Sequence, residues 1–139
     1  MSAIEWRQSI RSGDQRGQSM VEFALAALVF LLIIFGTVDF GRAVYEYNII
    51  ASSAREGARL AIIQSNTNTA IVDRVVTSSG NLISSADVSI SGSRTCTNLP
   101  CGPVTVAVTR IYTPATPLIA AITGNSLTLR ASSTMVVER

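Results

Sequence analysis

The segment RGQSMVEFALAALVFLLIIF, residues 16–35, combines a long apolar run with a single carboxylate, Glu22, near its beginning. The uncharged run Phe23–Val38 has 16 residues, or roughly 24 Å of helix at about 1.5 Å per residue. Extended by the two apolar residues before Glu22, it predicts one membrane-spanning helix over about 20–38, for a hydrocarbon core of about 30 Å. A charge at the centre of such a helix costs about 2.5–3.5 kcal/mol, and less near the surface, so the presence of Glu22 needs a reason.

A secretory signal peptide also combines a basic start with an apolar run, and it is the main alternative to a retained anchor. The run continues into GTVDFGRAVYEY, residues 36–47, where a cleavage site of small residues would be expected. The helical pattern also continues beyond this point. We therefore favour an anchor that is either uncleaved or trimmed only at its N-terminus.

The charges that flank the run predict its orientation. Three arginines precede it, at positions 7, 11 and 16, whereas Asp39 and Arg42 balance each other after it. The excess of positive charge places the N-terminus in the cytoplasm and the C-terminal part outside. We expect a single-pass protein of the inner (cytoplasmic) membrane, with a periplasmic or extracellular C-terminal domain.

Composition excludes several classes of function. The chain has 139 residues and a formal net charge of +2 that is spread along the sequence, so nucleic acid is not an expected partner. It has no histidine and only two cysteines, too few for a zinc site or a histidine-based triad. Asp73, Asp87 and Glu138 are far apart in sequence. We expect a protein that is not an enzyme and has no metal or cofactor.

The two cysteines lie close together in TCTNLPCG, residues 95–102. A turn containing Pro100 and Gly102 could bring Cys96 and Cys101 within disulfide range. In the chain-entropy estimate, so short a loop contributes only about 2 kcal/mol, so the bridge would stabilise a hairpin tip and not the whole fold. An exterior location favours this disulfide, and two free thiols in a reducing compartment are the alternative.

The helical pattern continues past the membrane as two opposite stripes. We predict a single helix over about Gln18–Gln64, apolar on all sides in its first half and amphipathic in its second. The small residues of the apolar stripe predict close packing against a sheet or another helix. The apolar stripe comprises Ala43, Tyr47, Ile50, Ala54, Ala58 and Ala61, and the polar stripe comprises Asn48, Ser52, Arg55 and Arg59.

Shorter elements follow the long helix. A second helix is predicted over about Thr69–Ser79, with Gly80 past its end. Alternating apolar residues predict three half-buried antiparallel strands, at about Val88–Ile90, Val104–Val108 and Leu127–Val137. The predicted fold class is α+β, in which the long N-terminal helix packs on a small antiparallel sheet and is joined by a short second helix.

The connection between the last two strands contains TPLIAAITG, residues 116–124. Thr116 is a suitable cap, Pro117 suits the first helical position, and Gly124 is a suitable stop. These three residues predict another short helix.

Gly17 stands between the arginine-bearing leader and the apolar run, and Glu22 is the fifth residue after it. This arrangement resembles the type IV prepilin signal, in which a prepilin peptidase cleaves after the glycine. Cleavage would give Gln18 a positively charged amine, which is the natural partner of Glu22 within one helix turn or on an adjacent subunit. The alternative is that Glu22 is an ordinary charge at the start of a helix, favoured by the macrodipole.

A longer stretch, residues 16–61, is similar to the TadE-like domain of the Tad (Flp) pilus system. The shared elements are the opening at Arg16–Leu25, the DFGR turn at Asp39–Arg42 and the AREGAR run at Ala54–Arg59. The tail LTLRASSTMVVER is also similar to the end of such proteins. Many relatives have a proline inside the apolar stretch, which this chain lacks.

The resemblance implies a pilin-like, non-enzymatic subunit: a minor pilin or pseudopilin that acts in assembly, or at the tip, of a Tad pilus. Implied partners are the prepilin peptidase, other pilin and pseudopilin subunits, the Tad inner-membrane assembly platform and the lipid bilayer. The implied organisation is a leader at 1–17, a long helix at 18–64 that is amphipathic over 39–64, and an exterior α+β domain at 65–139.

One alternative of a different class shares the same anchor and sheet. It is an unprocessed, single-span surface protein whose exterior domain is a binding or adhesive module. In that case Gly17 and Glu22 would be incidental.

Overall fold

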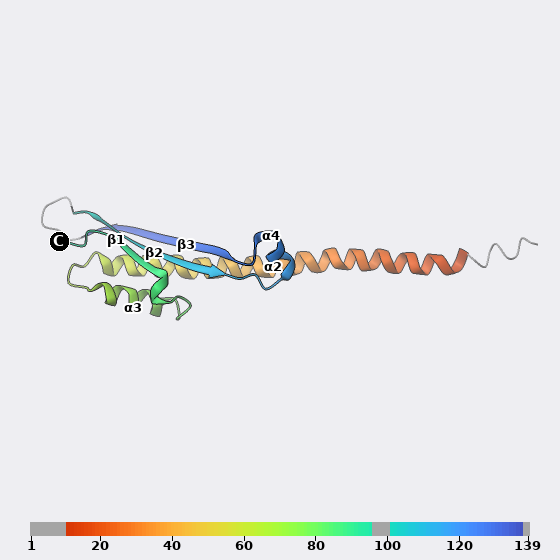
Figure 1. The fold of residues 1–139 in the computed structure, drawn as a ribbon, viewed down its shortest axis with the longest axis horizontal. Coiled ribbons are helices and arrows are strands. Elements are labelled where there is room, and N and C mark those ends of the chain that lie inside the picture. Colours follow the sequence, from red (N-terminus) through yellow and green to blue (C-terminus); the bar gives the residue numbers. More distant parts are fainter. Residues whose placement is uncertain (1–10, 96–100, 138–139) are drawn as a thin grey trace, which may run out of the picture. The chain divides into compact units, whose positions relative to one another are not determined.

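The computed structural model describes residues 11–95 and 101–137. Its elements, in chain order, are α2 (Arg11–Ala61), α3 (Asn68–Ser78), the 3-10 helix η1 (Ser85–Asp87), β1 (Val88–Gly92), β2 (Pro103–Tyr112), α4 (Pro117–Thr123) and β3 (Leu127–Val136) (Figure 1). The chain divides into two compact units, Met1–Val38 and Asp39–Arg139, and α2 contributes to both. The α+β class with a long N-terminal helix is confirmed.

The long helix has somewhat different bounds from the predicted Gln18–Gln64. It begins at Arg11, inside the predicted leader, and ends at Ala61. The sequence has no proline before position 100, so no proline interrupts the helical hydrogen bonds within α2. At the C-terminal end, the backbone N–H of Ile63 donates to the Leu60 carbonyl at 3.2 Å, a tightening typical of a last turn.

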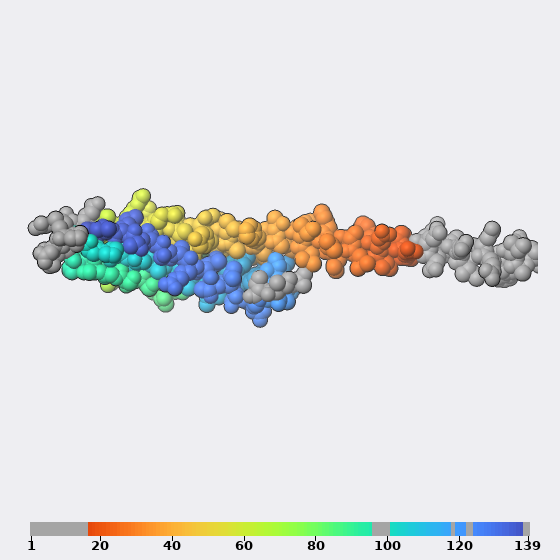
Figure 2. Space-filling model, turned by 90° about the horizontal axis from the view of Figure 1, so that it is seen from above, coloured from red at the N-terminus to blue at the C-terminus, as the bar shows by residue number. Residues whose placement is uncertain are grey.

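The three strands form one antiparallel sheet in the order β1-β2-β3. At its centre, Val106 of β2 is paired with Ile90 of β1 and Ser133 of β3. Even-numbered residues of β2 point into the core, and the odd-numbered residues of β3 from Leu129 onward are the less exposed ones, as the alternation predicts. Figure 2 shows β3, in blue, lying along the yellow part of α2.

The C-terminal part of α2 packs on this sheet through one face. Ile50, Ala54, Ala58 and Ala61 of the predicted apolar stripe are fully buried. The prediction was wrong for Tyr47, which is 46% exposed. At this turn of the helix the sheet faces position 46 instead of 47. The face of α2 that is buried or half-buried comprises positions 39, 43, 46, 50, 54, 57 and 61.

Gly57 marks the closest approach between α2 and its neighbours. A Cβ at this position would lie 2.4 Å from Cγ2 of Val75 in α3 and 3.2 Å from Cγ1 of Val106 in β2. Only a residue without a side chain allows three elements to meet here. The core therefore lies between α2, α3 and the sheet.

The second helix, α3, begins after Thr67, whose hydroxyl accepts a hydrogen bond from the Ala70 backbone N–H at 3.1 Å. Its buried residues are Ile71 and Val75. Gly80, past its end, has a φ of 64° and ends the helix as predicted.

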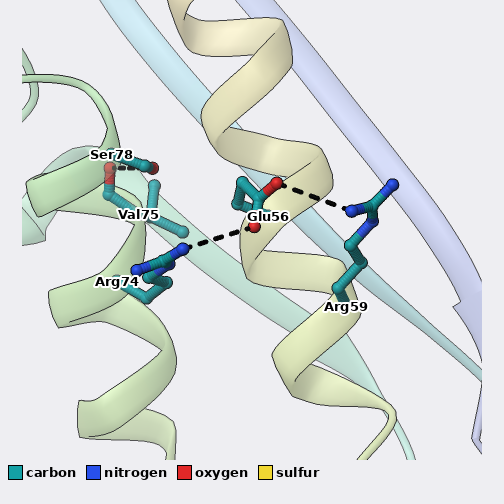
Figure 3. A network of polar contacts seen from close by, with 5 residues as sticks. All are labelled: Glu56, Arg59, Arg74, Val75 and Ser78. Atoms are coloured by element: carbon teal, nitrogen blue, oxygen red, sulfur yellow. Dashed lines mark hydrogen bonds and ion pairs between the residues drawn. The ribbon is translucent and has the colours of Figure 1, made fainter.

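Outside the core, Glu56 of α2 links two arginines (Figure 3). Its carboxylate lies 3.7 Å from Arg59, one turn along α2, and 3.7 Å from Arg74 of α3. All three side chains are more than a third exposed, so these ion pairs contribute little to stability.

Candidate functional site

The segment of α2 over about 20–38 is apolar on every side except at Glu22 and Thr37, and its most apolar 18-residue window has no protein cover in the described residues. This segment exposes Phe23, Phe30 and Ile33 by 74%, 63% and 63%, respectively. The mean hydropathy of its most apolar 18-residue window is 2.6, and none of that window is buried. By length and composition this helix can cross a membrane.

The single polar side chain near the end of this segment, Thr37, is satisfied within the helix. Its hydroxyl donates to the Ile33 carbonyl at 2.8 Å. An apolar solvent around this helix would therefore not meet an unpaired hydroxyl.

The residues of the predicted processing signal lie at the beginning of this helix. Gly17, Gln18 and Glu22 are all exposed. Gln18 and Glu22 are one helical turn apart and share a face with Val21 and Leu25. The structure thus brings Glu22 next to the residue that would carry a new amine after cleavage at Gly17.

A second group of polar residues surrounds Asp39, the first residue of the second unit. Asp39 is only 3% exposed. Its carboxylate accepts hydrogen bonds from the backbone N–H groups of Ala115, at 3.1 Å, and Thr116, at 2.9 Å. The Thr116 hydroxyl also donates to this carboxylate. Asp39 therefore attaches the β2–α4 connection to α2.

These donors determine the charge state of the buried carboxylate. The hydroxyl and then the backbone N–H of Thr116 hold the pKa of Asp39 below its ordinary value, against the opposing effect of desolvation. The backbone N–H of Ala115 and the charge of Arg42 act in the same direction. Asp39 is ionised at neutral pH and serves as an acceptor.

Tyr112 completes this group from the end of β2. Its hydroxyl donates to the backbone carbonyl of Asp39 at 2.9 Å, and the Arg42 guanidinium lies 5.9 Å from its ring centroid. Burial raises the pKa of Tyr112, and the negative charge of Asp39 adds to the shift. The buried phenol is therefore neutral and acts as a hydrogen-bond donor.

The sequence pattern predicts no role for Tyr112. It predicts that Asp39 balances the charge of Arg42 and that Thr116 caps a helix. In the structure Thr116 precedes α4 but makes no side-chain cap; its hydroxyl binds Asp39 instead. The available signal was the DFGR element, which begins with an acid directly after the apolar run.

The predicted disulfide stays a prediction. Cys101 is half-buried and packs against the core cluster, whereas Cys96 lies outside the described residues. Within residues 11–95 and 101–137, no three side chains of the metal-ligating types lie together.

Comparison with known proteins supports the resemblance stated above. The family described as TadE-like protein matches residues 17–59, from the predicted cleavage glycine to the last turn of α2. No curated protein and no solved structure matches the chain. Residues 17–59 are therefore similar to the TadE-like family, and this similarity suggests a protein associated with the Tad pilus.

Proposed function

We propose that this chain is a minor pilin or pseudopilin that a prepilin peptidase cleaves between Gly17 and Gln18, and that it takes part in assembly or tip formation of a Tad pilus. The observation that carries the proposal is the extent of the family match, which begins at Gly17 and covers the apolar half of α2. In this function the protein acts by packing and carries out no reaction of its own.

The division of α2 supports this role. An uncovered apolar half, with a lone Glu22 at its beginning, suits first a bilayer and then a bundle of similar helices. One face of the other half is covered by its own sheet, so that face is not available to such a bundle. Its proposed partners are other pilin and pseudopilin subunits and the inner-membrane assembly platform.

Glu22 has a specific part in this proposal. After cleavage, the amine of Gln18 would carry a positive charge one turn away, and pairing with it would offset the cost of a carboxylate at the membrane. Pairing between subunits would also determine the axial position of each helix relative to its neighbour. Glu22 is thus proposed to set the axial register of assembly.

The first experiment measures the intact mass and the N-terminal sequence of the protein from its native membrane. We expect Gln18 as the first residue, and we expect Gly17→Val to abolish this processing because a branched side chain then precedes the scissile bond. Gly41→Val is the matched control, since a Cβ at either glycine meets no atom within 4 Å. An N-terminus at Met1 or Ser2 in cells with an active prepilin peptidase would contradict the proposal and favour a plain membrane-anchored module.

A second experiment separates processing from assembly. Glu22→Gln should still be cleaved after Gly17 but should be lost from the pilus fraction. Glu56→Gln, also on α2 but half-buried in the second unit, should be cleaved and incorporated normally. Normal incorporation of Glu22→Gln would rule out the proposed role of this carboxylate.

A further inference from the structure

The direction of β2 along α2 places the β2–β3 connection at one particular end of the second unit. Val106 lies opposite Gly57, Arg110 lies 3.5 Å from Glu46, and Tyr112 bonds to Asp39. From its N-terminus to its C-terminus, β2 therefore runs antiparallel to α2, toward residues of α2 with lower numbers. The connection that follows Tyr112 therefore lies at Asp39, the first residue of the second unit.

Hydrogen bonds to Asp39 fix the start of this connection. The backbone N–H groups of Ala115 and Thr116 lie 3.1 and 2.9 Å from the Asp39 carboxylate. Asp39 is the residue after Val38, with which the uncharged run ends. Since α2 rises only about 1.5 Å per residue, α4 begins close to the level at which the helix leaves the hydrocarbon core.

The connection has the composition expected of a segment at a membrane surface. Residues 113–126 contain no charged residue, and α4 itself is PLIAAIT. Figure 1 shows α4 at the end of the sheet where β2 ends and β3 begins. The headgroup layer on each side of the hydrocarbon core is about 6 Å deep, and α4, with seven residues, is roughly 10 Å long. A short helix held at Asp39 therefore starts within this layer.

Residues near this connection are also apolar or aromatic, and they are exposed. Phe40 is 71% exposed, and Ile111, next to the end of β2, is 64% exposed. Aromatic side chains are enriched at the boundary between lipid and water, and the Arg42 guanidinium is close enough in sequence to reach lipid phosphates. Phe40 follows the uncharged run after a single residue, so lipid is the natural neighbour of its exposed ring.

We propose that α4 and the connection at 113–126 form a second membrane contact, lying against the lipid headgroup and upper acyl region of the bilayer that the first half of α2 crosses. Asp39 is the positioning residue that holds this contact at the membrane surface. The contact would restrain the second unit at the bilayer, in addition to the covalent link through α2. This inference rests on the membrane anchor of the proposed function.

The test uses nitroxide labels on the full chain in phosphatidylethanolamine and phosphatidylglycerol vesicles. Single cysteines replace Ala121 in α4, Ser132 in β3 and Phe30 in the apolar run, all three of which are exposed positions. The background is Cys96→Ser/Cys101→Ser. The measured quantity is the collision rate of each label with oxygen, which is enriched in lipid, relative to a water-soluble nickel chelate.

We expect a high oxygen preference at position 30, an intermediate one at 121 that is several-fold above that at 132, and a nickel preference at 132. Asp39→Ala should move the value at 121 toward that at 132 and leave position 30 unchanged. A nickel preference at 121 together with an oxygen preference at 30 would overturn this inference alone. A nickel preference at 30 would overturn the anchor itself. Low collision with both reagents at 121 would mean that a protein surface covers α4, which also overturns the inference.

A second measurement keeps the native cysteines. The only tryptophan, Trp6, is replaced by phenylalanine, and a new one is introduced as Ala121→Trp or Ser132→Trp. Lipids brominated in the upper acyl chain should quench fluorescence at 121 and not at 132. Equal quenching at both positions would contradict the proposed contact.

Discussion

The two halves of α2 are one continuous helix, yet their apolar residues have opposite environments. Ile33 in the first half is 63% exposed, whereas Ile50 in the second half is fully buried under the sheet. The segment over about 20–38 is apolar on all sides except at Glu22 and Thr37, so no single small sheet could cover it. The second half is apolar on one face only, and that face has Ala and Gly where other elements approach. The distribution of apolar residues around the helix, and not the tendency to form a helix, decides what covers each half.

The largest expected effect tests this contrast with the same substitution in each half. Ile50→Ala should lower the free energy of unfolding of the second unit by about 2–5 kcal/mol, because it leaves a cavity in the core. Ile33→Ala should leave that quantity almost unchanged. The measurement is thermal or denaturant unfolding of the full chain in detergent, followed by circular dichroism. Equal effects of the two substitutions would mean that the halves do not differ as described.

Glycine substitutions within α2 should give the next largest difference. Gly57→Ala should destabilise the second unit by about 1–3 kcal/mol, since its Cβ would lie 2.4 Å from Val75 and the core must shift. Gly41→Ala should be neutral or stabilising by up to about 1 kcal/mol, because its Cβ meets nothing and alanine favours the helix. The same unfolding experiment compares them, and a Gly57→Ala protein as stable as the wild type would rule out the close approach.

Asp39, at the boundary between the halves, should show a smaller and pH-dependent effect. Its pKa is lowered in the folded protein, so its stabilising contribution is present above the unfolded value of about 3.9 and is lost as pH falls through the lower folded value. Asp39→Asn should lower the Tm at neutral pH and flatten the decrease in Tm on acidification. The measurement is a series of melts from about pH 6 to about pH 2.

The control for this pH series is Asp73→Asn, at an exposed position of α3. It should leave the acid part of the profile close to that of the wild type. If the Tm values of Asp39→Asn and of the wild type decrease in parallel on acidification, the hydrogen bonds from Ala115 and Thr116 do not stabilise the ionised form of Asp39.

The smallest expected effect concerns the surface of the second half. Glu56→Gln removes the ion pairs with Arg59 and Arg74, which are exposed, and should cost at most about 1 kcal/mol. Added salt should reduce the difference from the wild type, as it screens exposed charges. A loss comparable to that of Ile50→Ala would show that this cluster is part of the core.

Much of the fold could be predicted from the sequence because its signals are periodic. The alternation in Val104, Val106 and Val108 predicted a strand with one buried face, and these residues are buried. Gly80 and Gly124 predicted helix ends, and both have a positive φ. The predicted apolar stripe was wrong at Tyr47. A helical pattern shows which residues share a face of the helix, but it does not show along which line the sheet crosses that face.

Polar contacts between distant segments could not be predicted in the same way. Arg94 shows why: its guanidinium donates to the Asn68 side chain at 2.6 Å and to the carbonyls of Ala61 and Ile63 at 3.4 Å each. These partners are 26 to 33 residues away. No local pattern identifies such a pairing, since it joins residues that are far apart in the sequence.

The sequence by itself determined the apolar run, the position of Gly17 and Glu22 before it, the α+β class and the two characters of the long helix. These properties follow from residue type and local spacing, on which burial in lipid or in a core directly depends. Only the tertiary structure decided that Asp39 binds the connection after β2, that Gly57 is the point of closest packing and that Arg94 completes the end of α2. Each of these contacts depends on where the chain returns in space, and that is set by the packing of the whole domain.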